Sequence, residues 1–110
     1  NIPNSVIDMS SAFYRCNNLT GNIPNIPDSV TNMSSAFREC TNLARNGQNL
    51  YIFSNKINDV TNCFTDCNFT NYINLHIYPN TTTYNTFYSY LGNTIDNSTM
   101  KIRIIADSNF

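Results

Sequence analysis

Apolar side chains recur along this chain in two alternating patterns. From Met9 to Cys16 the apolar positions are separated by three, one and three residues, and the same series recurs from Met33 to Cys40. This spacing aligns apolar side chains on one face of a helix, so it predicts two short helices over these segments. Elsewhere apolar and polar residues alternate one by one, which predicts strands. The predicted strands cover 22–24, 48–53, 72–78 and 100–105.

The two predicted helices belong to a longer duplication. Residues 26–43 repeat residues 2–19 at an offset of 24 without a gap, and a third copy aligns on Phe64 and Cys67 at an offset of 51 from the first. A degenerate fourth copy aligns on Phe87. A period of roughly 23 to 27 residues with one helical turn and one strand is typical of leucine-rich repeats. The sequence therefore predicts a single α/β domain over 1–110, built as a leucine-rich-repeat-like solenoid.

The predicted solenoid consists of four stacked units. A single unit is too small to bury its apolar face, so neighbouring units share a continuous core between parallel strands and helical segments. The last unit departs from the pattern because aromatic residues crowd it, which is typical of a terminal cap. Residue 1 also falls inside a repeat, so we expect the chain to be a piece of a longer protein. The predicted units cover about 1–24, 25–54, 55–79 and 80–110.

The repeated motif carries a family resemblance. The pattern Ile-Pro-x-Ser-Val-x-x-Met-Ser-Ser-Ala-Phe-x-x-Cys-x-x-Leu is complete in 26–43 and in 2–19. It resembles the BspA-like leucine-rich repeat family of bacterial surface proteins over about 2–79, and the resemblance is weak over 80–110. The copy at Cys67 departs from the motif at its alanine and leucine positions. The resemblance implies a right-handed β/α solenoid, an extracellular or cell-wall location, and adhesion or protein binding.

Composition excludes some classes of function. Only 12% of the residues are charged and the formal net charge is −1, so the chain lacks the basic patch that nucleic-acid binding requires. No apolar run approaches the roughly 20 residues of a membrane-spanning helix. About a fifth of the residues are asparagine, which favours turns and left-handed backbone positions. An AT-rich coding genome would give the same bias, and both explanations stay open.

The four cysteines follow the repeat. Cys16, Cys40 and Cys67 hold one repeat position, and Cys63 holds a slot that is alanine in the first two copies. This placement favours buried thiols that fill a core position. Zinc ligation is the alternative, although the usual CxxC spacing is absent. A Cys16–Cys40 disulfide would need Cα atoms within about 7 Å of each other. We expect no metal and no cofactor.

The predicted strands offer a candidate binding face. In a parallel sheet, alternate residues form columns that run across the strands. We align Ile23, Leu50, Leu75 and Ile102 as an inward column. Because Tyr and Arg are enriched at interface hot spots, the outward columns form a candidate patch for a protein or glycan, with an ordinary solvated sheet face as the alternative. These columns are Asn49, Asn74 and Lys101, beginning at Asn22, and Tyr51, His76 and Arg103, beginning at Pro24.

Catalytic chemistry has little support in the sequence. His76 is the only histidine, and its predicted column neighbours, Tyr51 and Arg103, do not orient a general base. The acidic residues are scattered, and helix capping explains why Asp8 and Asp59 share a repeat position. We therefore expect a non-enzymatic cell-surface adhesion module that binds an extracellular or host protein, or a glycan. The alternatives are a structural spacer or capping domain without a ligand, and an accessory domain that grips a polysaccharide for an enzyme.

Overall fold

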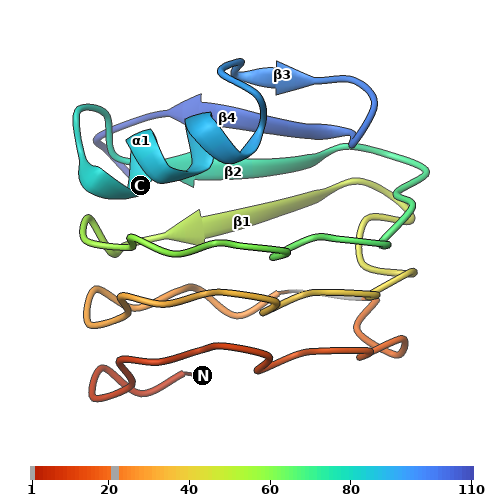
Figure 1. Cartoon of the computed structure of the whole chain (residues 1–110), viewed down its shortest axis with the longest axis horizontal. Helices are drawn as coiled ribbons and strands as arrows, with labels where there is room; N and C mark the ends of the chain where they lie inside the picture. The colour runs from red at the N-terminus through yellow and green to blue at the C-terminus, as the bar shows by residue number, and fades with distance from the viewer. Residues whose placement is uncertain (1, 21–22) are drawn as a thin grey trace.

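The three clear copies of the motif lie side by side as extended, turn-rich segments (Figure 1). The structure is a computed structural model that describes residues 2–20 and 23–110. Its four-stranded sheet has the order β1-β2-β4-β3, in which β1, β2 and β4 are parallel and β3 is an antiparallel edge. The elements are β1 (Gln48–Ile52), β2 (Ile73–Ile77), α1 (Thr82–Tyr90), β3 (Asp96–Asn97) and β4 (Ile102–Ala106).

The α/β class is confirmed, but the predicted leucine-rich-repeat-like right-handed solenoid of four units is wrong. Within the described residues the chain has one short helix and a mixed sheet, and turns replace the predicted helices over 9–16 and 33–40. The predicted first strand is also missing, since residues 23–24 are not in a strand and residue 22 lies outside the described residues. The described part of the chain contains no helix that is long and apolar enough to cross a membrane.

The helical spacing of the motif comes from consecutive tight turns. The N–H of Ala12 donates to the carbonyl of Met9 at 3.1 Å, and the N–H of Cys16 donates to that of Phe13 at 3.0 Å. Each turn returns an apolar side chain to the core after three residues, which mimics helical spacing. The third residue of each of these turns is left-handed, with φ near 57°, and a right-handed helix does not continue through such a residue. These residues are Ser11, Ser35 and Asn62 at one repeat position, and Arg15, Glu39 and Asp66 at another.

The polar residues at the start of each motif close side-chain turns. A carboxylate oxygen of Asp8 accepts the N–H of Ser10 at 2.8 Å, and Asn32 and Asp59 make the equivalent contacts in the next copies. We predicted helix capping by Asp8 and Asp59, and this is wrong because no helix follows either residue. The same hydrogen bond from Ser10 holds the pKa of Asp8 below its ordinary value.

Backbone hydrogen bonds join each copy to the next, with four at each junction running in one direction and one, from Thr31 to Ile7 or from Asn58 to Thr31, in the other. N–H groups of an earlier copy donate to carbonyls of the following copy at 2.8 or 2.9 Å. This ladder satisfies backbone groups that have no partner within their own copy. The first copy uses the N–H groups of Met9, Ser11, Phe13 and Arg15 and the carbonyls of Asn32, Ser34, Ala36 and Arg38; the second uses Met33, Ser35, Phe37 and Glu39 with Asp59, Thr61, Cys63 and Thr65.

Repeated apolar positions stack into one core. Phe13, Phe37 and Phe64 lie ring on ring, with centroids 5.2 and 5.5 Å apart and planes within 11° of parallel. The inward residues of the strands close the core from the sheet side, and all are nearly or fully buried. These residues are Leu50 and Ile52 of β1, Ile73, Leu75 and Ile77 of β2, and Ile102 and Ile104 of β4.

Helix α1 lies where a fourth copy would follow the third. Its side-chain hydroxyls make hydrogen bonds to the third copy that backbone groups make between the earlier copies. Thr81 begins the helix by accepting the N–H of Tyr84 at 3.1 Å. The hydroxyl of Thr83 accepts the N–H of Ile57 at 3.0 Å and donates to the carbonyl of Ser54 at 2.7 Å. The hydroxyl of Tyr90 accepts the N–H of Phe64 at 2.9 Å. The third copy thus meets hydroxyl groups where the earlier copies meet another backbone.

Replacing Thr83 with valine is expected to lower the free energy of unfolding by about 2 kcal/mol. Valine keeps the shape but leaves the buried N–H of Ile57 and the buried carbonyl of Ser54 without partners. Urea unfolding checks this, with Thr83→Ser as the matched control that keeps the hydroxyl. An equal loss in both variants would contradict the role given to the hydroxyl.

Candidate functional site

The outward face of the sheet carries the predicted site residues in two rows. Asn49 of β1 pairs with Asn74 of β2, and Tyr51 pairs with His76, as we predicted. The predicted register of β4 is wrong by two residues. Arg103 pairs with Asn74, and Ile105 occupies the place beside His76 that we assigned to Arg103. Lys101 precedes β4 with a φ of 58° and belongs to neither row.

Aromatic rings gather on this face beyond the two that we predicted. Tyr51 and His76 stack with centroids 4.4 Å apart and planes 22° from parallel. Phe110 packs on Tyr78 at 4.6 Å, on Phe53 at 5.3 Å and on Tyr51 at 5.8 Å. We call Tyr51, Phe53, His76, Tyr78 and Phe110 the aromatic cluster. Its members are all partly buried, so the cluster forms a partly exposed surface.

The sequence contained a signal for part of this cluster. Phe53 follows Tyr51 by two residues and Tyr78 follows His76 by two, so strand alternation places them on the same face. Phe110 follows β4 and reaches the cluster through a turn of the chain, which no local pattern indicates.

Amides hold the histidine in one orientation. Nε2 of His76 lies 3.0 Å from the side-chain oxygen of Asn49, and Nδ2 of Asn74 lies 3.5 Å from the same oxygen. Because an amide oxygen only accepts, His76 donates through a protonated Nε2. Burial lowers the pKa of His76, and the negative charge of Asp107 opposes that shift. The imidazole is therefore held neutral at pH 7 and serves as an oriented hydrogen-bond donor.

Stability is expected to fall as the pH drops below about 7, because the pKa of His76 is lower in the folded chain than the ordinary value near 6.5. Between the two values the unfolded chain binds more protons, so acid favours unfolding and neutral pH favours folding. Urea titrations between pH 7 and 5 check this. His76→Gln removes the only histidine, and its stability should be flat over that interval. A parallel decline in both proteins would assign the effect to the carboxylates.

Arg103 is held in a polar corner beside β3. Its guanidinium lies 3.9 Å from the ring centre of Tyr72 and 3.4 Å from a carboxylate oxygen of Asp96. The hydroxyl of Tyr72 donates to Asp96 at 2.8 Å, and this hydrogen bond raises the pKa of Tyr72. Lys101 lies 5.8 Å above the same ring. The corner presents cations already oriented by an aromatic ring. Neither Tyr72 nor Asp96 is among the site residues predicted from the sequence.

Two grooves open beside the aromatic cluster on the side of the first copy. One encloses about 570 Å³ between Pro3, Pro27 and Phe53. The other encloses about 440 Å³ and is lined by Ile23, Asn49 and Tyr51, among others. Asn25 lines both grooves, and each groove includes one member of the aromatic cluster, Phe53 in the first and Tyr51 in the second. A ligand on the cluster could extend into either groove.

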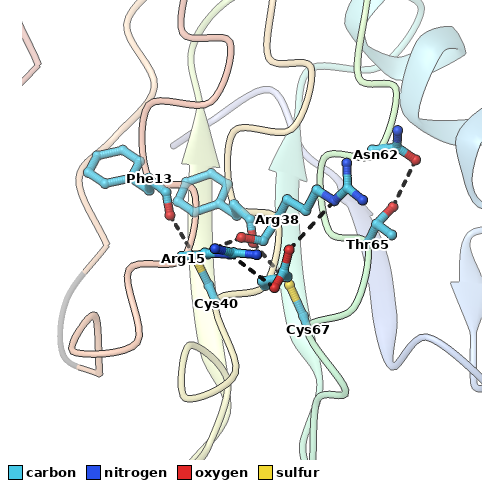
Figure 2. Close-up of polar contacts among 9 residues, drawn as sticks. Phe13, Arg15, Arg38, Cys40, Asn62, Thr65 and Cys67 are labelled. Carbon is cyan, nitrogen blue, oxygen red and sulfur yellow. Dashed lines mark hydrogen bonds and ion pairs between the residues drawn. The ribbon is translucent and has the colours of Figure 1, made fainter.

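The thiols serve the core and the ladder. Figure 2 shows the thiols of Cys40 and Cys67 directed at backbone carbonyls of the preceding copies. Cys40 donates to Phe13 at 2.9 Å, and Cys67 donates to Phe37 at 3.0 Å. All four cysteines are free, and Cys16 is the one that is not fully buried. Among residues 2–20 and 23–110, no three His, Cys, Asp or Glu side chains form a group that could hold a metal ion.

Comparison with protein-family models gave no match, and comparisons with curated proteins and with solved structures gave none either.

Proposed function

We propose that this chain is a non-enzymatic binding module that recognises a partner protein through the outward face of its sheet. The observation that carries the proposal is the aromatic cluster, in which five partly buried rings adjoin one another on a single face. Contiguous apolar surface of this kind, bordered by polar residues, is typical of protein interaction sites. Tyr51 and Arg103 add the residue types that dominate binding energy at interfaces.

The orientation of the rings favours a protein over a glycan. Tyr51 and His76 stand on adjacent strands and stack face to face, and Tyr78 and Phe110 do the same at a 15° angle between their planes. Sugars bind to aromatic side chains by lying on an open ring face, and in both pairs one face of each ring is covered by the other ring. The rims of the rings and the amides of Asn49 and Asn74 suit the mixed apolar and polar contacts of a protein surface.

A cell-surface location is part of the same proposal, and its support is the resemblance of the repeated motif to the BspA-like bacterial surface proteins. The low charge and the many Asn, Thr and Ser side chains are compatible with an exposed adhesive surface. A module of this kind would act by holding its partner, and the neutral, amide-bound His76 would contribute a hydrogen bond.

Binding of the whole chain to immobilised host extracellular-matrix proteins and to a glycan array tests the proposal. We expect at least one protein to bind, and the double variant Tyr51→Ser, His76→Ser to weaken that binding by roughly tenfold or more. Tyr14→Ser is the matched control, since Tyr14 is an exposed aromatic residue in the first copy. Binding to glycans alone would overturn the choice of partner. Binding that survives the double variant would overturn the site, and no binding to any probe would favour a structural spacer.

A further inference from the structure

The side of the first copy that faces away from the second, here called the N-terminal edge, differs in burial from the equivalent positions further along. In the second copy four repeated apolar residues are fully buried, whereas their counterparts in the first copy are exposed or only partly buried. The positions are the same, and the difference is that the second copy has a neighbouring copy on both sides whereas the first has one on a single side. The pairs are Ala36 and Ala12, Phe37 and Phe13, Cys40 and Cys16, and Leu43 and Leu19.

Backbone hydrogen bonding at the N-terminal edge is incomplete as well. In the second and third copies, four alternate carbonyls accept N–H groups from the copy before them. The first copy has carbonyls at these positions too, and within the described ranges none accepts a hydrogen bond from another part of the chain. The edge also has one N–H group at a donor position. The N–H of Ile7 occupies the repeat position from which Thr31 and Asn58 donate to the preceding copy. The four carbonyls are those of Asp8, Ser10, Ala12 and Tyr14.

A second molecule of this chain does not supply what the edge requires. Two N-terminal edges facing each other would bring four carbonyls against four carbonyls. At the opposite end of the molecule, the hydroxyls of Thr83, Thr86 and Tyr90 are engaged with the third copy, and β3 closes the sheet as an antiparallel edge. The occupant must instead offer alternate N–H groups in register with small and aromatic side chains.

We propose that the N-terminal edge is a docking surface for a polypeptide segment that carries a further copy of the repeat found at residues 2–25. Such a segment has the register of the existing interfaces, in which the N–H groups at repeat positions 9, 11, 13 and 15 donate to the next copy. Its phenylalanine extends the ring stack of Phe13 and Phe37, and its small residue covers Ala12. The surface is separate from the aromatic cluster, so the inference does not depend on the proposed function.

The test is a chain extended by one copy of residues 2–25 placed directly before Ile2, with the extension's own cysteine replaced by alanine. Fusion supplies a high local concentration, so weak docking is still detected. The measurement is the rate at which an alkylating reagent modifies Cys16, read by mass spectrometry. We expect the rate to fall on the order of a hundredfold relative to the unextended chain, because modification then requires local opening. Equal rates in the two chains would overturn the proposal.

Ala12→Lys is the matched variant. Ala12 is exposed in the unextended chain, so lysine there should leave the unfolding midpoint unchanged, but in the extended chain it should restore the reactivity of Cys16. Protection that survives Ala12→Lys would show that the extension covers Cys16 by some other route and would overturn the docking geometry. The buried thiol of Cys40 reports whether the chain is folded in the same samples. Faster alkylation of Cys40 in the extended chain would also count against docking. A dimer of the unextended chain that buries Cys16, seen by sedimentation, would overturn the choice of occupant.

Discussion

Phe37→Ala is expected to lower the free energy of unfolding by about 4 kcal/mol. Phe37 is fully buried and stacks between Phe13 and Phe64, at 5.2 and 5.5 Å. Alanine would remove the central ring of the stack and leave a cavity that the backbone ladder on both sides prevents from collapsing. Because domains of this size are stable by only about 5 to 15 kcal/mol, the variant should lose between roughly a quarter and four fifths of its stability. Urea unfolding measured by circular dichroism gives the value.

Phe13→Ala is the internal comparison for this prediction. Phe13 occupies the same repeat position but is partly exposed and stacks on only one ring. Its replacement should cost about 1 to 2 kcal/mol, in proportion to the smaller area that it removes from water. Equal losses at the two positions would show that the stack does not act through burial.

Alkaline unfolding beginning near pH 9 is the second large effect that we expect. Burial raises the pKa of Cys40 to about 11 and that of Cys67 to about 12, and it raises the pKa of Cys63 as well. In the unfolded chain thiols ionise near roughly 8.5. Above that pH the folded chain holds more protons than the unfolded chain, so stability falls as the pH rises through the folded values. Each such thiol removes about 1.4 kcal/mol per pH unit.

Cys63→Ala isolates one thiol from this effect. Alanine occupies the same slot in the first two copies, where Ala36 is fully buried, so the core should accept it. Between pH 9 and 11 the free energy of unfolding of the variant should fall less steeply with pH, by an amount that corresponds to about one proton. Urea titrations at several pH values would reveal this difference. An unchanged slope would mean that Cys63 does not titrate on unfolding, and the pH dependence would then belong to other groups such as Tyr90, whose pKa burial raises to about 12.

Strand positions were the most predictable part of the fold, because alternation is a property of the strand itself. The predicted segments 48–53 and 72–78 contain β1 and β2, and Leu50 pairs with Leu75 as expected. The register of β4 failed because a shift of two residues leaves every inward side chain inward. Hydrophobic pattern therefore does not distinguish Ile102 from Ile104 as the partner of Leu75.

The prediction of helices was wrong for a different reason. Spacing of three and four residues indicates a helix only where the backbone stays right-handed. Ser11 and Arg15 are left-handed, and neither serine nor arginine is a residue type that predicts this conformation. The candidate site was predictable for Tyr51 and His76, which share a row through strand pairing. Phe110, Tyr72 and Asp96 join the surface through contacts that depend on how distant segments fold together.

The left-handed residues also restrict how this sequence can diverge. Ten non-glycine residues of the described chain have positive φ, and four of them are asparagine: Asn62, Asn68, Asn80 and Asn93. Valine, isoleucine and threonine are strongly disfavoured at such positions, whereas asparagine, aspartate and glycine are accepted. Five of the ten are Asn or Asp and the other five are Ser, Arg, Glu or Lys, so none is β-branched, and part of the asparagine content reflects a backbone requirement. A library that samples only Asn, Asp, Gly and Ser at these ten sites should retain folded members far more often than one that samples all residues.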